Sequence, residues 1–228
     1  MAVFAIADPH LSRVAQKPMT VFGPSWEGHP EAFFTGWRSV VAPEDLVIVA
    51  GDISWGLRLE EAWPDLEDLF ALPGKKILLR GNHDYWWPSL NKLTKLLPEG
   101  VYVLQNNAVI VDGVAVVGTR GWIVPGDRGF NQEEARIYQR EAARLELSLA
   151  DLAGREYQDL ILAFHYPPVG VNREANLFTA AIERISPRVV VYGHLHGADS
   201  QRLVPEWHGI PLKLVAADYL KFVPLQIL

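Results

Sequence analysis

The chain has 228 residues, of which 49% are hydrophobic, so it has enough apolar side chains to bury a full core. Its formal net charge is −6 at pH 7 and it has no long basic run, which argues against a nucleic-acid-binding surface. It contains no cysteine, which excludes disulfides and thiolate metal sites, so any metal must be held by His, Asp, Asn or Glu.

The start of the sequence predicts neither a signal peptide nor a membrane span. The apolar run at residues 2–7 follows Met1 directly, without a basic region, and no apolar run approaches the ~18 residues of a membrane span. We therefore expect a soluble, cytoplasmic protein without a membrane partner. There is no internal repeat, and residues 1–228 are expected to form one domain, whose oligomeric state the sequence leaves open.

Apolar runs alternate with helical patterns along the first half of the chain. Strands are expected at residues 3–7, 46–50 and 76–79, and helices at 31–41, 59–70 and 88–97. Pro64 indicates that the second of these helices begins late or in two pieces. Residues 11–30 are rich in proline, glycine and polar side chains and predict a long loop of the kind that rims a site.

The second half begins with three short β-rich runs and continues with helices between strands. Asp112-Gly113 indicates a hairpin turn between the last two of these runs. The clearest helix is expected at 131–152, with Asn131 as its N-cap and Glu134 completing a capping box, and the region 120–154 could form a cap beside a site. The predicted elements are strands at 101–104, 108–111, 114–118, 161–164 and 189–192, a helix at 174–185, and two or three strands after residue 203.

Metal-binding residue types gather where five of the apolar runs end. They are Asp8, His10, Asp52, Asn82, His83, His165, His194 and His196. Because the carboxyl ends of parallel strands meet at one edge of a sheet, this pattern predicts an α/β fold with these side chains close together. A single histidine of this kind is more often a hydrogen-bonded structural residue. Five of the seven histidines lie at strand ends, however, which favours a metal centre.

The mixture of carboxylate, amide and imidazole groups indicates which metals would bind. It suits Mn, Fe, Zn, Ni or Co better than Ca, and manganese is the preferred choice. Eight groups are too many for one ion. Two ions about 3.5–4 Å apart can share a carboxylate and a water molecule, lower the pKa of that water and stabilise an in-line displacement at phosphorus. The sequence therefore predicts two divalent metal ions and phosphoester hydrolysis.

These motifs resemble, in order and over most of the chain, the five motifs of the calcineurin-like metallophosphoesterases. The matching segments are Asp8-x-His10, Gly51-Asp52, Gly81-Asn82-His83-Asp84, His165 and Gly193-His194-x-His196. The resemblance implies a four-layer α/β/β/α sandwich and a metal-bridging hydroxide as the nucleophile. It implies that one metal is held by Asp8, His10, Asp52 and His196, and the other by Asp52, Asn82, His165 and His194, with Asp52 as the bridge. It also implies that His83 contacts the phosphate and protonates the leaving oxygen, and that Asp84 orients His83.

Two arginines are candidates for substrate binding. The segment from Leu78 to His83 is similar to that of the phosphoprotein phosphatase branch, in which the arginine at the position of Arg80 grips the phosphate, and a guanidinium favours a doubly ionised monoester. The similarity stops after Asp52, where residues 53–56 lack that branch's second arginine, and Arg80 could equally pair with an acidic neighbour. Arg120 is expected either to contact the substrate or to form an ion pair with the acidic helix.

The expected function is hydrolysis of a phosphomonoester, on a phosphorylated small molecule or a nucleotide. One alternative is a phosphodiesterase for nucleotide diesters, with tryptophans stacking on a base. The candidates for stacking, which could equally pack in the core, are Trp55, Trp86, Trp87 and Trp122. Another alternative is a metal-stabilised binding scaffold without catalytic activity. His29 and His208 have no motif context and are given no role.

Overall fold

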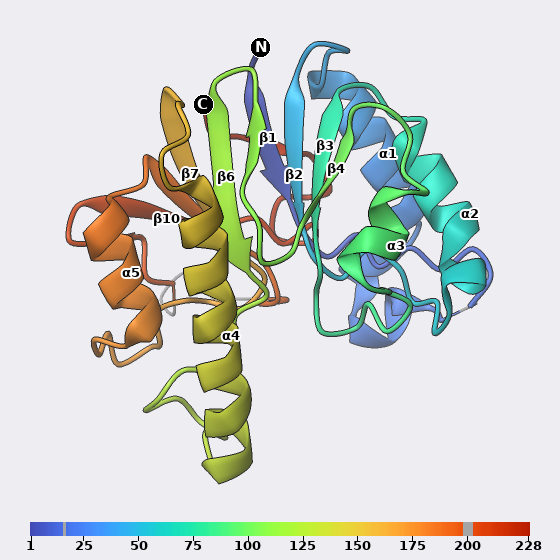
Figure 1. Ribbon diagram of the computed structural model, residues 1–228. Coiled ribbons are helices and arrows are strands. Elements are labelled where there is room, and N and C mark those ends of the chain that lie inside the picture. Colours follow the sequence, from blue (N-terminus) through green and yellow to red (C-terminus); the bar gives the residue numbers. More distant parts are fainter. Residues whose placement is uncertain (16, 198–202) are drawn as a thin grey trace.

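Successive side chains of a buried strand point to opposite faces of its sheet, so the apolar side chains of one strand belong to two separate cores. In β1 (Val3–Ile6), Val3 and Ala5 face the space between two sheets, whereas Phe4 and Ile6 face a layer of helices. Because both faces are covered, these strands are continuous apolar runs in the sequence. The computed structural model describes residues 1–15, 17–197 and 203–228, and it has two sheets packed between two layers of helices (Figure 1). This confirms the four-layer α/β/β/α sandwich.

The first sheet has five strands in the order β11-β1-β2-β3-β4. Its strands besides β1 are β2 (Leu46–Ala50), β3 (Lys75–Leu79), β4 (Val101–Leu104) and β11 (Leu225–Gln226). The strands β1 to β4 are parallel, and β11 is antiparallel to β1. The helices packed on the outer face are α1 (His29–Val40), α2 (Leu59–Phe70) and α3 (Leu90–Thr94).

The second sheet has six strands in the order β5-β6-β7-β8-β10-β9. They are β5 (Val109–Val111), β6 (Val114–Thr119), β7 (Asp159–Phe164), β8 (Val189–Tyr192), β9 (Glu206–Trp207) and β10 (Ile210–Leu214). Its outer face packs against α4 (Gln132–Leu152) and α5 (Leu177–Ile185). Figure 1 shows the N-terminal turns of α4 extending beyond the sheet. No helix within the described ranges is long and apolar enough to cross a membrane.

Turns and caps explain most of the element boundaries. Asp112 and Gly113 both have positive φ angles, 47° and 85°, as a tight hairpin between β5 and β6 requires. Asn131 caps α4 as predicted, by accepting hydrogen bonds from the backbone N–H groups of residues 133 and 134. The capping-box prediction for Glu134 is wrong, because the carboxylate of Glu134 accepts a hydrogen bond from the indole of Trp122 instead.

Four features of the predicted elements need correction. The helix α2 is continuous from residue 59, and the packing of Leu66 and Leu69 in the core offsets the one helical hydrogen bond that Pro64 cannot make. The helix expected from residue 174 begins only at residue 177, because Asn176 forms a capping box with Thr179. The helix α3 is shorter than expected, and the loop at 11–30 contains the 3-10 turns η1 (Met19–Phe22) and η2 (Pro24–Trp26).

A buried lysine ties β3 to the end of α2. The side chain of Lys76 is 2% exposed, and its Nζ donates hydrogen bonds to the carbonyls of Leu72, at 2.6 Å, and Gly74, at 2.7 Å. These carbonyls follow the last turn of α2, where a helix has unsatisfied acceptors and partial negative charge. The lysine therefore satisfies buried acceptors that no water can reach easily.

We expect Lys76→Met to lower the free energy of unfolding by about 1–3 kcal/mol, because it leaves these carbonyls without a donor. Urea denaturation followed by circular dichroism measures this change. Lys75→Met is the matched control on the same strand, since Lys75 forms only a partly exposed ion pair with Asp112 and its loss should change stability less. Equal stability of the two variants would contradict the capping role.

Candidate metal centre

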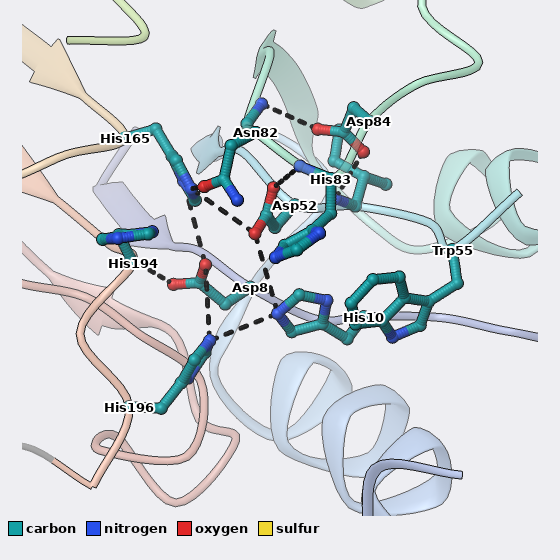
Figure 2. A network of polar contacts seen from close by, with 12 residues as sticks. Asp8, His10, Asp52, Trp55, Asn82, His83, Asp84, His165, His194 and His196 are labelled. Carbon is teal, nitrogen blue, oxygen red and sulfur yellow. Dashed lines mark hydrogen bonds and ion pairs between the residues drawn. The ribbon is translucent and has the colours of Figure 1, made fainter. Parts of the chain in front are cut away.

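The polar residues that follow the strands converge on a common centre. Figure 2 shows their side chains facing one another. Asp8 and His10 follow β1, Asp52 follows β2, Asn82, His83 and Asp84 follow β3, His165 follows β7, and His194 and His196 follow β8. The side chains predicted as metal ligands are therefore brought together, whereas Arg80 and Arg120 line a separate hollow.

Unusual backbone conformations aim several of these side chains. Asp8, His10, Asp52 and His194 have φ angles of 59°, 46°, 52° and 69°, in the left-handed region that non-glycine residues rarely adopt. A strained backbone conformation persists only where the surrounding structure holds it in place, and such residues are common at functional sites. Glycine permits the close packing, because a Cβ at position 81 would lie 2.0 Å from Asp52 Oδ1.

One group of possible ligands comes from the first and last motifs. The ligand atoms of Asp8, His10 and His196 all lie within 4.8 Å of one another. The Nε2 atoms of His10 and His196 are 3.2 Å apart. Asp8 Oδ1 is buried and has no hydrogen-bond partner among the described residues. A buried acceptor without a donor is costly, and a cation between these three atoms would satisfy it.

A second group shares the carboxylate of Asp8 and adds Asp52 and His165. His165 donates from Nδ1 to the carbonyl of Ala50 at 3.0 Å, which leaves Nε2 facing the centre. That Nε2 lies 2.8 Å from Asn82 Oδ1 and 3.4 Å from Asp52 Oδ2. Asp52 Oδ2 is also 3.8 Å from His10 Nε2, so it lies between the two groups.

The position of His194 is fixed by its backbone and by an aromatic neighbour. Its backbone N–H donates to Asp8 Oδ2 at 2.9 Å. Its ring stacks on Tyr166 with centroids 3.8 Å apart and lies 5.2 Å from the ring of His165. His194 therefore borders the second group, beside the nitrogen that His165 presents.

Burial sets the protonation states in the centre. It raises the pKa of Asp8 to about 7, although the charge of His165 opposes the shift. Burial would also raise the pKa of Asp52, but the charge and hydrogen bond of His165 outweigh it, and this pKa lies below its usual range. Burial lowers the pKa of His10 and His194 to about 3, so both rings are neutral at pH 7. Burial opposes the shift, but the charge of Asp52 raises the pKa of His165 to about 9, so this ring must release a proton when a cation binds. Neutral imidazoles and carboxylates are what divalent cations bind, and a cation next to Asp52 would replace the proton on His165, so the residues fit two metals.

The two residues predicted as catalytic have different surroundings. The imidazole of His83 is half-buried and lies 4.5 Å from the Trp55 ring and 5.9 Å from the His10 ring. The carboxylate of Asp84 accepts hydrogen bonds from the backbone N–H groups of residues 53, 54 and 81 and from the indole of Trp86. The expectation that Asp84 orients His83 therefore needs correction, because this carboxylate joins the loops after β2 and β3.

Aromatic side chains wall the first ligand group. The ring of Trp55 stacks on His10 with centroids 4.8 Å apart and an interplanar angle of 18°, and Trp26 contacts the rings of both His10 and His196. His29, which had no expected role, is buried with Nε2 at 3.2 Å from the carbonyl of His10. No spacing in the sequence indicates these contacts. An apolar wall lowers the local dielectric and limits access of water to the centre.

The other tryptophans pack rather than face the centre. Trp86 and Trp87 are 3% and 6% exposed and belong to the core between the first sheet and its helices. Trp122 is packed between Arg120, whose guanidinium carbon lies 4.4 Å from the ring, and Tyr166, at a centroid distance of 4.7 Å. Arg120 forms the ion pair with the acidic helix, at 2.9 Å from Glu141.

Asp218 is a neighbour of the centre that the sequence did not reveal. Its Oδ1 lies 3.1 Å from His196 Nδ1, and its Oδ2 accepts a hydrogen bond from the backbone N–H of Gly197. A carboxylate on Nδ1 holds a histidine in the tautomer that presents Nε2 to a metal. Asp218 follows β10, which pairs with β8. Only this pairing brings it beside the last motif.

Asp218→Ala should weaken Mn²⁺ binding about 10- to 100-fold, because His196 loses the partner that orients it. Asp218→Asn keeps an acceptor and should lose less. Calorimetric titration of chelator-treated protein with Mn²⁺ measures both affinities. Asp68→Ala, which removes a partly exposed carboxylate from α2, is the control, and wild-type affinity in Asp218→Ala would refute the orienting role.

Comparison with known proteins agrees with this geometry. No curated protein matches the chain in sequence. The phosphopantetheinyl hydrolase of Mycobacterium tuberculosis has a similar structure, with a TM-score of 0.60 and 17% identity over 99% of this chain and 94% of that one. A protein of unknown function from Aquifex aeolicus gives a TM-score of 0.52 and 17% identity over 98% of this chain and 94% of that one.

These two structures show a shared fold. A family model described as calcineurin-like phosphoesterase matches residues 1–198, which include every motif residue of the centre. The chain therefore belongs to the calcineurin-like phosphoesterase family and is a metal-dependent phosphoric ester hydrolase.

Proposed function

We propose that the enzyme uses two divalent metal ions, preferably manganese, to hydrolyse phosphomonoesters. The observation that carries the proposal is the position of the Asp52 carboxylate. Its Oδ2 lies 3.8 Å from His10 Nε2 and 3.4 Å from His165 Nε2, between the two groups of possible ligands. A carboxylate in this position can serve two ions at once.

The proposed ligand sets divide the centre into halves that share Asp52. One half is Asp8, His10, Asp52 and His196, and the other is Asp52, Asn82, His165 and His194. Asp8 lies within reach of both groups as well, and we assign it to the first half because its Oδ1 lacks a hydrogen-bond partner among the described residues. When bound, the ions supply an activated water and Lewis-acid stabilisation of the charge that develops on the phosphoryl oxygens. The chain holds the ligand nitrogen and oxygen atoms in fixed orientations. The left-handed backbone at several ligand residues and the hydrogen bond from His165 to the carbonyl of Ala50 maintain these orientations.

His83 is the proposed proton donor to the leaving oxygen. Its backbone N–H donates to Asp52 Oδ1 at 2.8 Å, which holds the residue against the shared carboxylate. Its ring belongs to neither ligand group, and it remains half-buried beside Trp55. A ring that is close to the centre but is not needed for the metals can exchange protons with the substrate.

The surroundings support a monoester more than a nucleotide diester. Trp86 and Trp87 are buried in the core and Trp55 already stacks on His10, so these three rings offer no free face for a base. Arg80 and Arg120 line a hollow on the side of Asn82 and His165 and add positive charge there, which favours a dianionic phosphate.

His83→Ala should lower kcat by about 10²- to 10⁴-fold while the protein still binds Mn²⁺, because only proton transfer is lost. Asp52→Asn should lose both activity and metal binding, since it removes the shared carboxylate. Hydrolysis of para-nitrophenyl phosphate and calorimetric Mn²⁺ titration measure the two properties. A binding scaffold would lose nothing in His83→Ala, and full activity of Asp52→Asn with excess metal would exclude the proposed centre.

With Mn²⁺ bound, kcat/KM for para-nitrophenyl phosphate should exceed that for bis(para-nitrophenyl) phosphate by about tenfold or more, or about 1.4 kcal/mol of transition-state stabilisation. The reason is the second negative charge of the monoester, which the positive surroundings favour. Stopped-time assays with both esters at equal concentrations give the ratio. A faster diester reaction would overturn the proposed preference for monoesters.

A further inference from the structure

Three arginines line a small hollow next to the metal centre. Arg80 comes from the end of β3, Arg120 from the end of β6 and Arg144 from α4. The backbone connects the hollow to the centre, because Arg80 precedes Asn82 by two residues and the carbonyl of Arg120 accepts a hydrogen bond from the backbone N–H of His165 at 3.1 Å, although none of the predicted ligands lines the hollow. It therefore lies on the side of the centre formed by Asn82 and His165.

The hollow carries more positive than negative charge. Glu141 is fully buried and is the one acidic residue among the described residues that line the hollow. It accepts hydrogen bonds from Arg120 at 2.9 Å and from Arg144 at 2.7 Å, and Thr119 bonds its other oxygen at 2.7 Å. One carboxylate thus faces three guanidinium groups.

The arginines also have unused hydrogen-bonding capacity. Arg120 Nε is buried and has no acceptor in the described part of the chain. Arg80 donates from Nε to the carbonyl of Asp84 at 3.2 Å. Burial, and after it the charge of Arg120, lowers the pKa of Arg80, so the cations are crowded as well as partly desolvated. An anion would offset both the repulsion and the missing acceptor.

The position of Arg120 is fixed relative to the centre. Its guanidinium lies over Trp122, Trp122 packs on Tyr166, and Tyr166 stacks on the predicted ligand His194. Glu141 holds the guanidinium from the other side. A group bound in the hollow would therefore keep a constant distance from the reacting phosphate.

We propose that this hollow binds a second phosphate group of the substrate, so that the natural substrates are phosphomonoesters that carry another phosphate on the leaving-group side. The inference rests on the proposed function, which places the reacting phosphate at the metal centre. Planar guanidinium groups match phosphate oxygens in pairs, and three of them converge here. The hollow has a volume of about 30 Å³, far too small for a nucleobase, so a phosphate group would meet the guanidinium groups at its mouth.

The first experiment measures anion binding without catalysis. Chelator-treated wild-type protein is titrated calorimetrically with inorganic phosphate, together with Arg144→Gln and the control Arg140→Gln, an exposed arginine one turn earlier on α4. We expect saturable binding by the wild type and the control, and about tenfold weaker binding by Arg144→Gln, which loses a charge-assisted contact. Absent binding by the wild type, or equal binding by all three proteins, would overturn the proposal.

The second experiment separates this inference from the proposed function. The Mn²⁺-loaded proteins hydrolyse para-nitrophenyl phosphate and an alkane-diol bisphosphate. Arg144→Gln should raise KM about tenfold for the bisphosphate and leave the kinetics of the aryl phosphate unchanged. Equal effects on both esters would overturn the second phosphate site. If wild-type protein hydrolyses neither ester while Arg144-dependent phosphate binding persists, the anion site stands and the monoester function fails.

Discussion

Two carboxylates buried side by side impose the constraint on which the rest of the molecule depends. Asp8 and Asp52 are 0% and 1% exposed, and in the absence of cations each disfavours the charge of the other. The chain meets this cost by surrounding them with imidazoles, of which His165 lies against both, at 3.8 Å and 3.4 Å. Either a proton on Asp8 or compensating positive charge relieves the repulsion, so the same desolvation that raises the pKa of Asp8 favours the binding of metal ions.

The two sheets meet at this centre through backbone hydrogen bonds. Ala7 donates to the carbonyl of Val215 at 2.7 Å and accepts from the N–H of Ala217 at 2.9 Å, so a residue of the first sheet is paired with the segment after β10. Within the first sheet, the carboxylate of Asp84 connects the loop after β2 to the loop after β3. Because backbone and buried side chains are bonded in this way, strained left-handed residues can be held without loss of the fold.

The sequence predicts the features that are local to a strand and the residues that follow it. Apolar runs ending in Asp, Asn or His identify both the sheets and the ligands, because parallel strands bring their carboxyl ends to one edge. Contacts made by distant segments carry no such signal: Asp218 reaches His196 only through the pairing of β10 with β8, and Trp26 reaches it from a loop. The break expected at Pro64 is absent for a related reason, since tertiary packing outweighs a local preference.

The pairing of β11 with β1 has a consequence for biosynthesis. Residues 4 and 5 are paired with residues 226 and 225, and Asp218 contacts His196 of the centre. Asp8 and His10 thus leave the ribosome about two hundred residues before the strand that flanks β1 and before the carboxylate that orients His196, a delay of tens of seconds at ordinary rates of translation. The full set of predicted ligands, with the carboxylate that orients His196, is therefore present only once residue 218 has been synthesised, and the edge of the first sheet is complete only with residue 226.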